Sequence, residues 1–324
     1  MKTITELQKI INQAIAEKQY TGSPKELYEP INYLMDLGGK RMRPVLLLMA
    51  CNLYTNNIDG AINPALGIEV FHNFTLVHDD IMDQAPLRRG KPTVHKKWNE
   101  NIAILSGDVM LVESYKLMMQ VNPEILIPVL NTFNNTAVGV CEGQQIDMNF
   151  EKRNHVEAEE YINMIRLKTA ILLGCALKIG ALIGGSSKTD AELLYDFGVN
   201  LGIAFQLQDD ILDVYGDPEK FGKQVGGDII SNKKTFMLIK AKELANGHLA
   251  DDLDQWLNYS ADDVLDKINA VISIYNSLQV KELAQTEMNG FVKKALESLD
   301  KVSIDNKRKE NLKTFADQLL VREN

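Results

Sequence analysis

Apolar residues recur three and four positions apart along almost the whole chain, which is the spacing of one face of an α-helix. No segment alternates with a period of two over any length, and the polar connections between the periodic segments are short. The pattern therefore predicts an all-α fold in one large domain, residues 1–324. The expected helices cover residues 5–18, 45–54, 64–84, 102–120, 124–149, 156–182, 190–215 and 234–243, with several more in 261–321.

The amino-acid composition excludes some classes of protein but does not indicate which reaction, if any, the chain catalyses. The 324 residues are 45% hydrophobic and 24% charged, which is ordinary for a soluble globular protein. The formal net charge of -9 argues against a nucleic-acid partner, and an anionic substrate would need local cations to overcome it. Cys51, Cys141 and Cys175 form no CxxC motif and lie in apolar stretches, so we expect buried thiols in a reducing compartment.

Neither the N-terminal residues nor the most apolar segment of the chain indicates a membrane protein. The first ten residues carry Lys2, Glu6 and Lys9 and have no apolar core, so they do not resemble a secretory signal. The segment 169–185 is the most apolar, but Lys178 interrupts it and it is short for a bilayer. We expect a buried core helix there, no membrane span, and a cytoplasmic location.

Two aspartate-rich motifs are the main chemical signal. Residues 79–83 read DDIMD and residues 209–213 read DDILD, each within an apolar predicted helix. Residues i and i+4 share a helical face, so Asp79 and Asp83 project together, as do Asp209 and Asp213. Paired carboxylates in apolar surroundings repel each other, and a cation removes that cost. Oxygen-only ligands suit magnesium that shares phosphate oxygens, so the motifs predict sites for a metal-bound diphosphate. The alternative is a solvated acidic helix face.

Cations accompany both motifs. Residues 38–44 read GGKRMRP and place Lys40, Arg41 and Arg43 beside two glycines and before an expected helix start at Pro44, a suitable place for an anion. Pro86 can end the helix of the first motif, and Arg88 and Arg89 follow it within one loop. The alternative for GGKRMRP is a basic surface loop.

Further cations lie near the second motif. Lys223 and Lys233 flank a glycine-rich loop at 222–228, in which Asp228 could also reach a metal. Lys168 and Thr169 stand in an apolar helix, where a lysine needs an anionic partner. His72 lies two helical turns before Asp79 on nearly the same face, which favours the site over a core position.

Together these segments resemble the trans-isoprenyl diphosphate synthase (polyprenyl synthetase) family. GGKRMRP, HDDIMDQAPLRRGKP, GQQID, RLKTA, FQLQDDILD and GDPEKFGK follow one another in the order of the family's motifs. The resemblance implies antiparallel helices around a deep central cavity, a homodimer, and three Mg²⁺ ions. It further implies a prenyltransferase that joins isopentenyl diphosphate to an allylic diphosphate (dimethylallyl, geranyl or farnesyl) and releases pyrophosphate.

The resemblance also implies roles for individual residues. Asp79 and Asp83 would bind two metal ions and Asp209 the third. Gln206 and the Thr169 carbonyl would steady the allylic cation, and Gln144 and Asp147 match a polar pair facing the first motif. The isopentenyl diphosphate site would be Lys40, Arg43, His72 and Arg89, and the allylic site Arg88, Lys168, Thr169, Gln206, Lys223 and Lys233. The loop 224–232 is one residue longer than in some members, and the C-terminus lacks the basic tail of others.

Product length depends, by the same resemblance, on bulky residues before Asp79. Thr75 is small and should not block the tunnel, whereas Phe74 and Phe71 lie about 7.5 and 12 Å below Asp79 at 1.5 Å rise per residue. We expect a C20 (geranylgeranyl) product ahead of C15 (farnesyl). The alternatives are a medium- or long-chain synthase, a terpene cyclase, and a non-catalytic partner subunit. Both complete DDxxD motifs argue against the last two, and the phenylalanines could instead be core packing.

Overall fold

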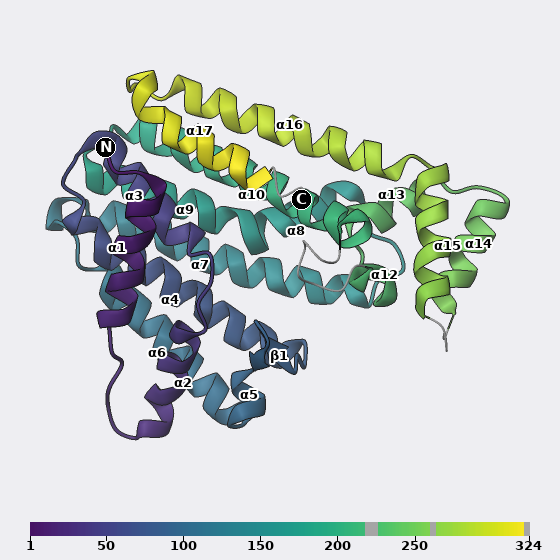
Figure 1. Ribbon diagram of the computed structural model, residues 1–324, viewed down its shortest axis with the longest axis horizontal. Helices are drawn as coiled ribbons and strands as arrows, with labels where there is room; N and C mark the ends of the chain where they lie inside the picture. Colours follow the sequence, from purple (N-terminus) through teal and green to yellow (C-terminus); the bar gives the residue numbers. More distant parts are fainter. Residues whose placement is uncertain (218–225, 260–263, 321–324) are drawn as a thin grey trace. The chain divides into compact units, whose positions relative to one another are not determined.

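The helical pattern of the sequence is realised almost throughout the part of the chain that the computed structural model describes, residues 1–217, 226–259 and 264–320, without the side chain of residue 320 (Figure 1). These residues fall into two compact units, each built from separate stretches of the chain. The first unit comprises residues 1–134, 175–195 and 302–311, and the second comprises 135–174, 196–301 and 312–324.

Helix α4 is the core of the first unit. It packs on α3 and α6, and thirteen of its residues, from Ala61 to Asp80, are buried. Such a helix is apolar on nearly all sides because neighbours cover it on several faces. The unit contains α1 (Ile4–Glu17), α2 (Lys25–Asp36), α3 (Met42–Tyr54), α4 (Asp59–Met82), α5 (Val94–Lys97), α6 (Glu100–Met118) and the strands β1 (Leu87–Arg88) and β2 (Lys91–Pro92).

The second unit carries a break in helical geometry. Between α8 and α9, residues Arg166–Ala170 form a π-helical turn, η1, in which the Ile171 N–H donates to the Arg166 carbonyl five residues back. Helices α7 (Pro123–Glu151), α9 (Ile171–Gly184), α10 (Lys188–Tyr215) and α17 (Asn306–Leu320) contribute residues to both units. The remaining elements of this unit are α8 (Ala158–Ile165), α12 (Gly227–Ile230), α13 (Phe236–Leu244), α14 (His248–Asn258), α15 (Val264–Ser277) and α16 (Val280–Lys301).

The all-α prediction is confirmed, with differences at particular elements. The helix expected from Pro64 begins at Asp59 instead, because a proline near the start of a helix costs one hydrogen bond that packing offsets; Pro64 is buried inside α4. The helices α2 and α14 and the hairpin β1–β2 were missed. Cys141 is exposed, so its predicted burial was wrong, whereas Cys51 and Cys175 are buried.

The apolar segment around residue 178 is a core helix, as predicted. The stretch 158–184 is long and apolar enough to cross a membrane, but 61% of its most apolar window is buried among the described residues. Lys178 pairs with Glu192, with 2.5 Å between Nζ and Oε1. The single-domain prediction for residues 1–324 stays a prediction.

Candidate active site

The first acidic motif divides its three carboxylates by helical geometry. Asp80 is one residue, or about 100°, away from the face of Asp79, and its carboxylate is 1% exposed. Arg88 donates two hydrogen bonds to that carboxylate, with Nε 2.8 Å from Oδ2 and Nη2 2.6 Å from Oδ1. Asp79 is half-buried and Asp83 is exposed. The outer pair is therefore open to a ligand, and the inner carboxylate anchors an arginine.

Helix α4 ends earlier than Pro86 would require. Its last residue is Met82, and Asp83 is the cap that follows it. Gln84 adopts a φ of 51°, and the Ala85 N–H donates to the Asp80 carbonyl at 3.0 Å, which is the hydrogen bonding of a Schellman motif. The Asp83 N–H still bonds the Asp79 carbonyl at 2.8 Å, so the two carboxylates keep their helical register.

A two-residue hairpin turn presents Arg89. Strand β1 pairs with β2, and the turn residues Arg89 and Gly90 have φ values of 52° and 74°, as a type I′ turn requires. The Arg89 guanidinium donates to the Gly38 carbonyl. Gly39, at φ 134°, lies so close that a Cβ there would be 2.9 Å from this guanidinium. The glycines of GGKRMRP thus admit an arginine from the other motif.

Arg41 and Arg43 have different surroundings. Arg41 is buried, has a φ of 48°, and is the N-cap of α3, which begins at Met42, two residues before the expected Pro44. Its Nη1 donates to Glu69 Oε1 and its Nη2 to the Met35 carbonyl, both at 2.5 Å. Arg43 instead lies 3.1 Å from His72 Nε2, and its buried Nε has no hydrogen-bond partner among the described residues.

These arginines crowd one another around His72. Burial, followed by Arg43, Arg89, Arg88 and Arg41, holds the pKa of His72 well below its ordinary value, so the ring is neutral. Burial lowers the pKa of Arg43, and burial together with Arg41 lowers that of Arg89. Asp80 and Glu69 pair with Arg88 and Arg41, and in the described part of the chain neither Arg43 nor Arg89 forms an ion pair. A doubly charged anion would relieve this crowding.

The residues expected to control product length lie in an aromatic cluster of the first unit. Phe71 is fully buried, with its ring 5.6 Å from Phe74 and 5.1 Å from Phe133. Phe133 in turn contacts Tyr115 at 5.0 Å. Thr75 is half-buried and its hydroxyl donates to the His72 carbonyl. Phe133 and Tyr115 come from other helices, and the sequence gives no sign that they meet Phe71.

The second acidic motif has the same division of carboxylates. Asp210 is 3% exposed; its Oδ2 accepts from the Tyr161 hydroxyl at 2.5 Å and its Oδ1 from Gln206 Nε2 at 3.3 Å. Burial and then Asp228 raise the pKa of Asp210 to about 7, against the opposing effects of its hydrogen bonds. Asp209 and Asp213 are half-buried. Tyr161 was not among the predicted residues, since a tyrosine in an apolar segment carries no distinguishing signal.

The loop after α10 folds back on the second motif. The Asp213 side chain accepts from the Asp228 N–H at 2.9 Å, and its carbonyl accepts from the Gly226 N–H at 2.6 Å. Lys233 Nζ lies 4.0 Å from Asp228 Oδ1. Asp228, suggested by the sequence as a further metal ligand, therefore does lie beside the motif. Lys223 lies outside the described residues.

The π-helical turn η1 carries the other predicted residues of the allylic site. Lys168 Nζ is 2.6 Å from Asp147 Oδ2, and the Thr169 hydroxyl is 3.5 Å from Gln206 Oε1. Gly143 on α7 makes this possible, since a Cβ there would lie 2.3 Å from the Lys168 nitrogen. Isolated π-turns are rare and occur mostly at functional sites.

The donor set suits magnesium bound together with a diphosphate. Among the described residues, no group of three or more His, Cys, Asp or Glu side chains could hold a metal alone. The pair Asp79 and Asp83 supplies carboxylate oxygens only, which leaves further positions for water and phosphate oxygens. That is how Mg²⁺ usually binds in proteins.

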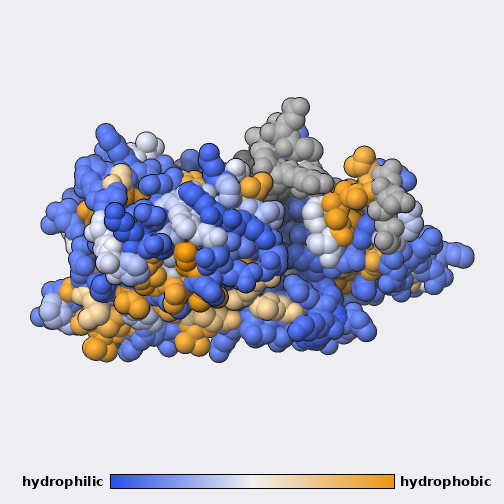
Figure 2. Space-filling view, turned by 90° about the horizontal axis from the view of Figure 1, so that it is seen from below, coloured by the Kyte–Doolittle hydropathy of each residue, from blue (hydrophilic) through white to orange (hydrophobic). Residues whose placement is uncertain are grey.

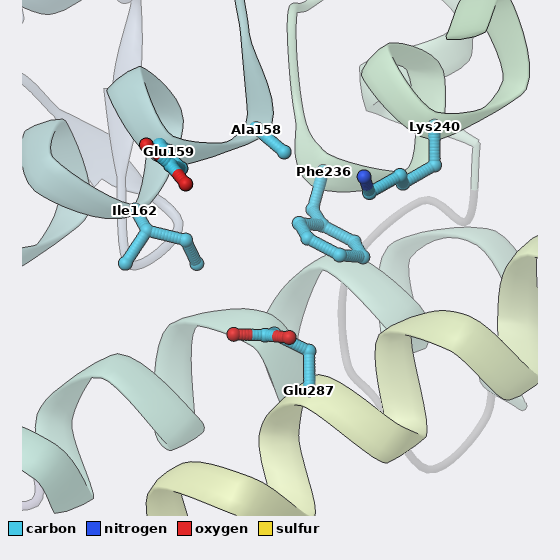
Figure 3. A pocket seen from close by; sticks show the side chains of 6 residues that line it. All are labelled: Ala158, Glu159, Ile162, Phe236, Lys240 and Glu287. Atoms are coloured by element: carbon cyan, nitrogen blue, oxygen red, sulfur yellow. The ribbon is translucent and has the colours of Figure 1, made fainter.

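Two cavities in the second unit lie apart from the predicted residues. One of about 330 Å³ is lined by side chains of α8, α13 and α16 (Figure 3). Another, of about 410 Å³, lies against α13 and α14. The predicted site residues line neither cavity, and the first is bordered by Ala158, Glu159, Ile162, Phe236, Lys240 and Glu287.

Comparison with known proteins agrees with this geometry. The family model of polyprenyl synthetases matches residues 24–275. A geranylgeranyl diphosphate synthase of Methanosarcina mazei is 41% identical over 235 residues, 72% of each chain. A geranylfarnesyl diphosphate synthase of Natronomonas pharaonis is 37% identical over 74% of this chain and 76% of the relative. A short chain isoprenyl diphosphate synthase of Methanothermobacter thermautotrophicus is 36% identical over 100% of this chain and 98% of the relative.

Solved structures extend the similarity to the fold. A crystal structure of a geranylgeranyl pyrophosphate synthase is 43% identical, covers all of both chains, and has a TM-score of 0.94. A polyprenyl synthase of Caulobacter crescentus, complexed with calcium and isoprenyl diphosphate, is 26% identical with a TM-score of 0.84, over 99% of this chain and 95% of that one. This chain therefore belongs to the polyprenyl synthetase family, as a prenyltransferase of the geranylgeranyl diphosphate synthase type that makes short-chain isoprenyl diphosphates.

Proposed function

We propose that the enzyme condenses isopentenyl diphosphate with allylic diphosphates, with magnesium as its metal, and that geranylgeranyl diphosphate is its main product. The observation that carries the proposal is the crowding of Arg43 and Arg89 around a neutral His72, which lies on α4 two helical turns before Asp79. These arginines have the charge, and Arg43 the uncompensated donor, to hold a diphosphate. Lys40, exposed at the start of the same motif, completes this isopentenyl site.

The allylic diphosphate has its own cations in this proposal. Lys168, Lys233 and Lys223 bind its phosphates, together with Arg88. Asp79 and Asp83 hold two magnesium ions and Asp209 a third, which neutralise the charge that develops on the leaving pyrophosphate. The amide of Gln206 and the carbonyl of Thr169 face the allylic cation with oxygens, which stabilise it without reacting. The isopentenyl double bond attacks that cation, and pyrophosphate accepts the proton.

The product is C20 because aromatic rings close the tunnel below Asp79. Phe74 is the nearer ring and is 8% exposed, while Phe71 is locked behind it against Phe133. The relatives include both geranylgeranyl and geranylfarnesyl diphosphate synthases. The alternative product length is therefore C25, whereas the sequence suggested the shorter C15 as the alternative.

We expect Phe74→Ala to lengthen the main product by one isoprene unit or more, and Phe71→Ala/Phe74→Ala to lengthen it further. The physical reason is that each substitution removes a ring from the proposed floor. Products formed with excess isopentenyl diphosphate are sized by chromatography. The matched control is Phe291→Ala, a comparably buried phenylalanine on α16. Wild-type products beyond C25, or unchanged lengths in the double variant, would place the floor elsewhere.

A homodimer is the proposed assembly, through an apolar stripe on α6. Figure 2 shows hydrophobic side chains reaching the surface in patches between polar ones. In the first unit Leu105 and Val112 on α6, and Met119, the cap that follows it, are all more than half exposed and follow at intervals of seven residues, as at a helical interface. Burying such a stripe against a second copy would remove it from water.

We expect the wild type to scatter light as a dimer at micromolar concentration and Leu105→Glu/Val112→Glu to scatter as a monomer. Two charges on each stripe would have to be desolvated for the copies to associate. Leu265→Glu serves as control, because Leu265 on α15 is also more than half exposed and lies off the stripe. A monomeric wild type contradicts the proposal, as does a double variant that remains dimeric.

A cytoplasmic location completes the proposal, in keeping with the three free thiols.

A further inference from the structure

We infer that Tyr161 is a positioning residue for the second acidic motif, acting through the inner aspartate Asp210. This inference rests on the proposed function, in which Asp209 binds metal. Tyr161 lies on α8, is 2% exposed, and directs its hydroxyl at the carboxylate of Asp210 on α10. Within the second unit this hydrogen bond joins α8, the helix that leads to Lys168, with α10, the helix that carries Asp209.

The contacts of Asp210 leave little freedom to its helix. Both carboxylate oxygens are engaged, Oδ2 by Tyr161 at 2.5 Å and Oδ1 by Gln206 at 3.3 Å. Asp210 follows Asp209 directly, so a rotation of α10 that moved one carboxylate would move the other. Since Gln206 is on α10 itself, Tyr161 is, of these two hydrogen-bond partners, the one that reaches Asp210 from another helix.

The position of Tyr161 also relates the motif to the π-helical turn. Tyr161 precedes Lys168 by seven residues, and η1 begins five residues after it. Gly202 on α10 lies against Ala170 of the same turn, where a Cβ would come within 2.7 Å of the Ala170 Cα. The Tyr161–Asp210 hydrogen bond therefore holds α8 and α10 in a fixed relative position next to the place where η1 packs on α10. In that position Lys168 and Asp209 can bind the same diphosphate.

A purely structural role predicts a different outcome from a positioning role. Removing one partner of a buried hydrogen bond lowers stability wherever it occurs. Removing a partner that orients a metal ligand additionally lowers metal affinity or activity by about 10- to 100-fold. Tyr215→Phe is the control, because Tyr215 lies on α10, the helix of Asp210, and its hydroxyl donates to Asn276 Oδ1 at 2.8 Å in a more exposed place.

The decisive experiment measures binding of inorganic pyrophosphate in the presence of Mg²⁺ by calorimetry. We expect Tyr161→Phe to weaken binding about 10- to 100-fold and Tyr215→Phe to leave it unchanged. In steady-state assays Tyr161→Phe should raise the magnesium concentration for half-maximal rate and lower kcat, with the KM for isopentenyl diphosphate unchanged. Asp210→Asn and the double variant Tyr161→Phe/Asp210→Asn should show non-additive losses, since the two side chains act as one unit.

Two results would overturn the inference. One is pyrophosphate binding by Tyr161→Phe equal to that of Tyr215→Phe, with only the melting temperature lowered. The other is additive effects of Tyr161→Phe and Asp210→Asn. Failure of the proposed function itself is recognised separately, by wild-type pyrophosphate binding and turnover in Asp209→Ala.

Discussion

Asp79→Ala and Asp209→Ala are each expected to lower kcat by about a thousandfold or more, with the fold intact. Each substitution removes a carboxylate that holds magnesium against the leaving diphosphate, and electrostatic stabilisation of that kind is commonly the largest contribution to catalysis. Both residues are only half-buried, so we expect the fold to tolerate their removal. The measurement is steady-state turnover at saturating magnesium, with circular dichroism to verify the helical content.

Asp252→Ala is the control for this pair, because Asp252 is an exposed carboxylate on α14 of the second unit. Its turnover should equal that of the wild type. Near-wild-type kcat in both Asp79→Ala and Asp209→Ala would refute the metal assignment. If either variant loses helical content, kcat is measured instead in Asp79→Asn and Asp209→Asn, which keep the side-chain volume.

The second large effect concerns stability, and it separates two arginines of one motif. We expect Arg41→Met to lower the free energy of unfolding by about 3–5 kcal/mol, because it leaves the buried Glu69 carboxylate without a compensating charge, with the Asn73 amide as its remaining side-chain donor. Arg43→Met should change stability far less, since Arg43 lies beside a neutral histidine. It should instead raise the KM for isopentenyl diphosphate about tenfold or more, with the allylic KM nearly unchanged.

Urea unfolding and the two KM values decide between these roles. The double variant Arg41→Met/Glu69→Leu should recover much of the lost stability, because it removes both charges together. Lys168→Ala provides the reverse pattern to Arg43→Met, raising chiefly the allylic KM. Equal KM changes in Arg43→Met and Lys168→Ala would sink the assignment of separate sites, and a stable Arg41→Met would show that Glu69 finds another partner.

Helical periodicity was sufficient to predict the long helices, because each buries an apolar surface that must recur every three or four residues. It failed where local chemistry interrupts the pattern. Pro30 stands inside α2 and Pro64 inside α4, and in both cases packing outweighs the lost hydrogen bond. The hairpin β1–β2 has two residues per strand, too few for any period to show.

The candidate site was predictable in its residue types but not in their individual environments. The i, i+4 spacing already places Asp79 and Asp83 on one face, and helical geometry alone turns Asp80 away from it. That Arg88 would pair with Asp80 depends on the course of the turn between α4 and β1, and that Arg41 rather than Arg43 would be buried on Glu69 depends on how α3 packs on α4. The partnership of Tyr161 with Asp210, 49 residues apart, is of the same kind.

The π-helical turn η1 has a consequence for how this chain tolerates changes in length. A turn closed by five residues holds one more residue than the α-helical repeat, so a deletion within Arg166–Ala170 could restore regular hydrogen bonding from Ala158 to Gly184. The wide turn already takes up this extra residue, so the residues on either side of the deletion would keep the faces on which they pack, whereas the same deletion in a regular α-helix would rotate all later residues by about 100°. Within the turn itself the backbone would change, and Lys168 and Thr169 would lose their present contacts with Asp147 and Gln206. At this point a single-codon deletion would cost function and spare folding, whereas deletions in other core helices would cost both.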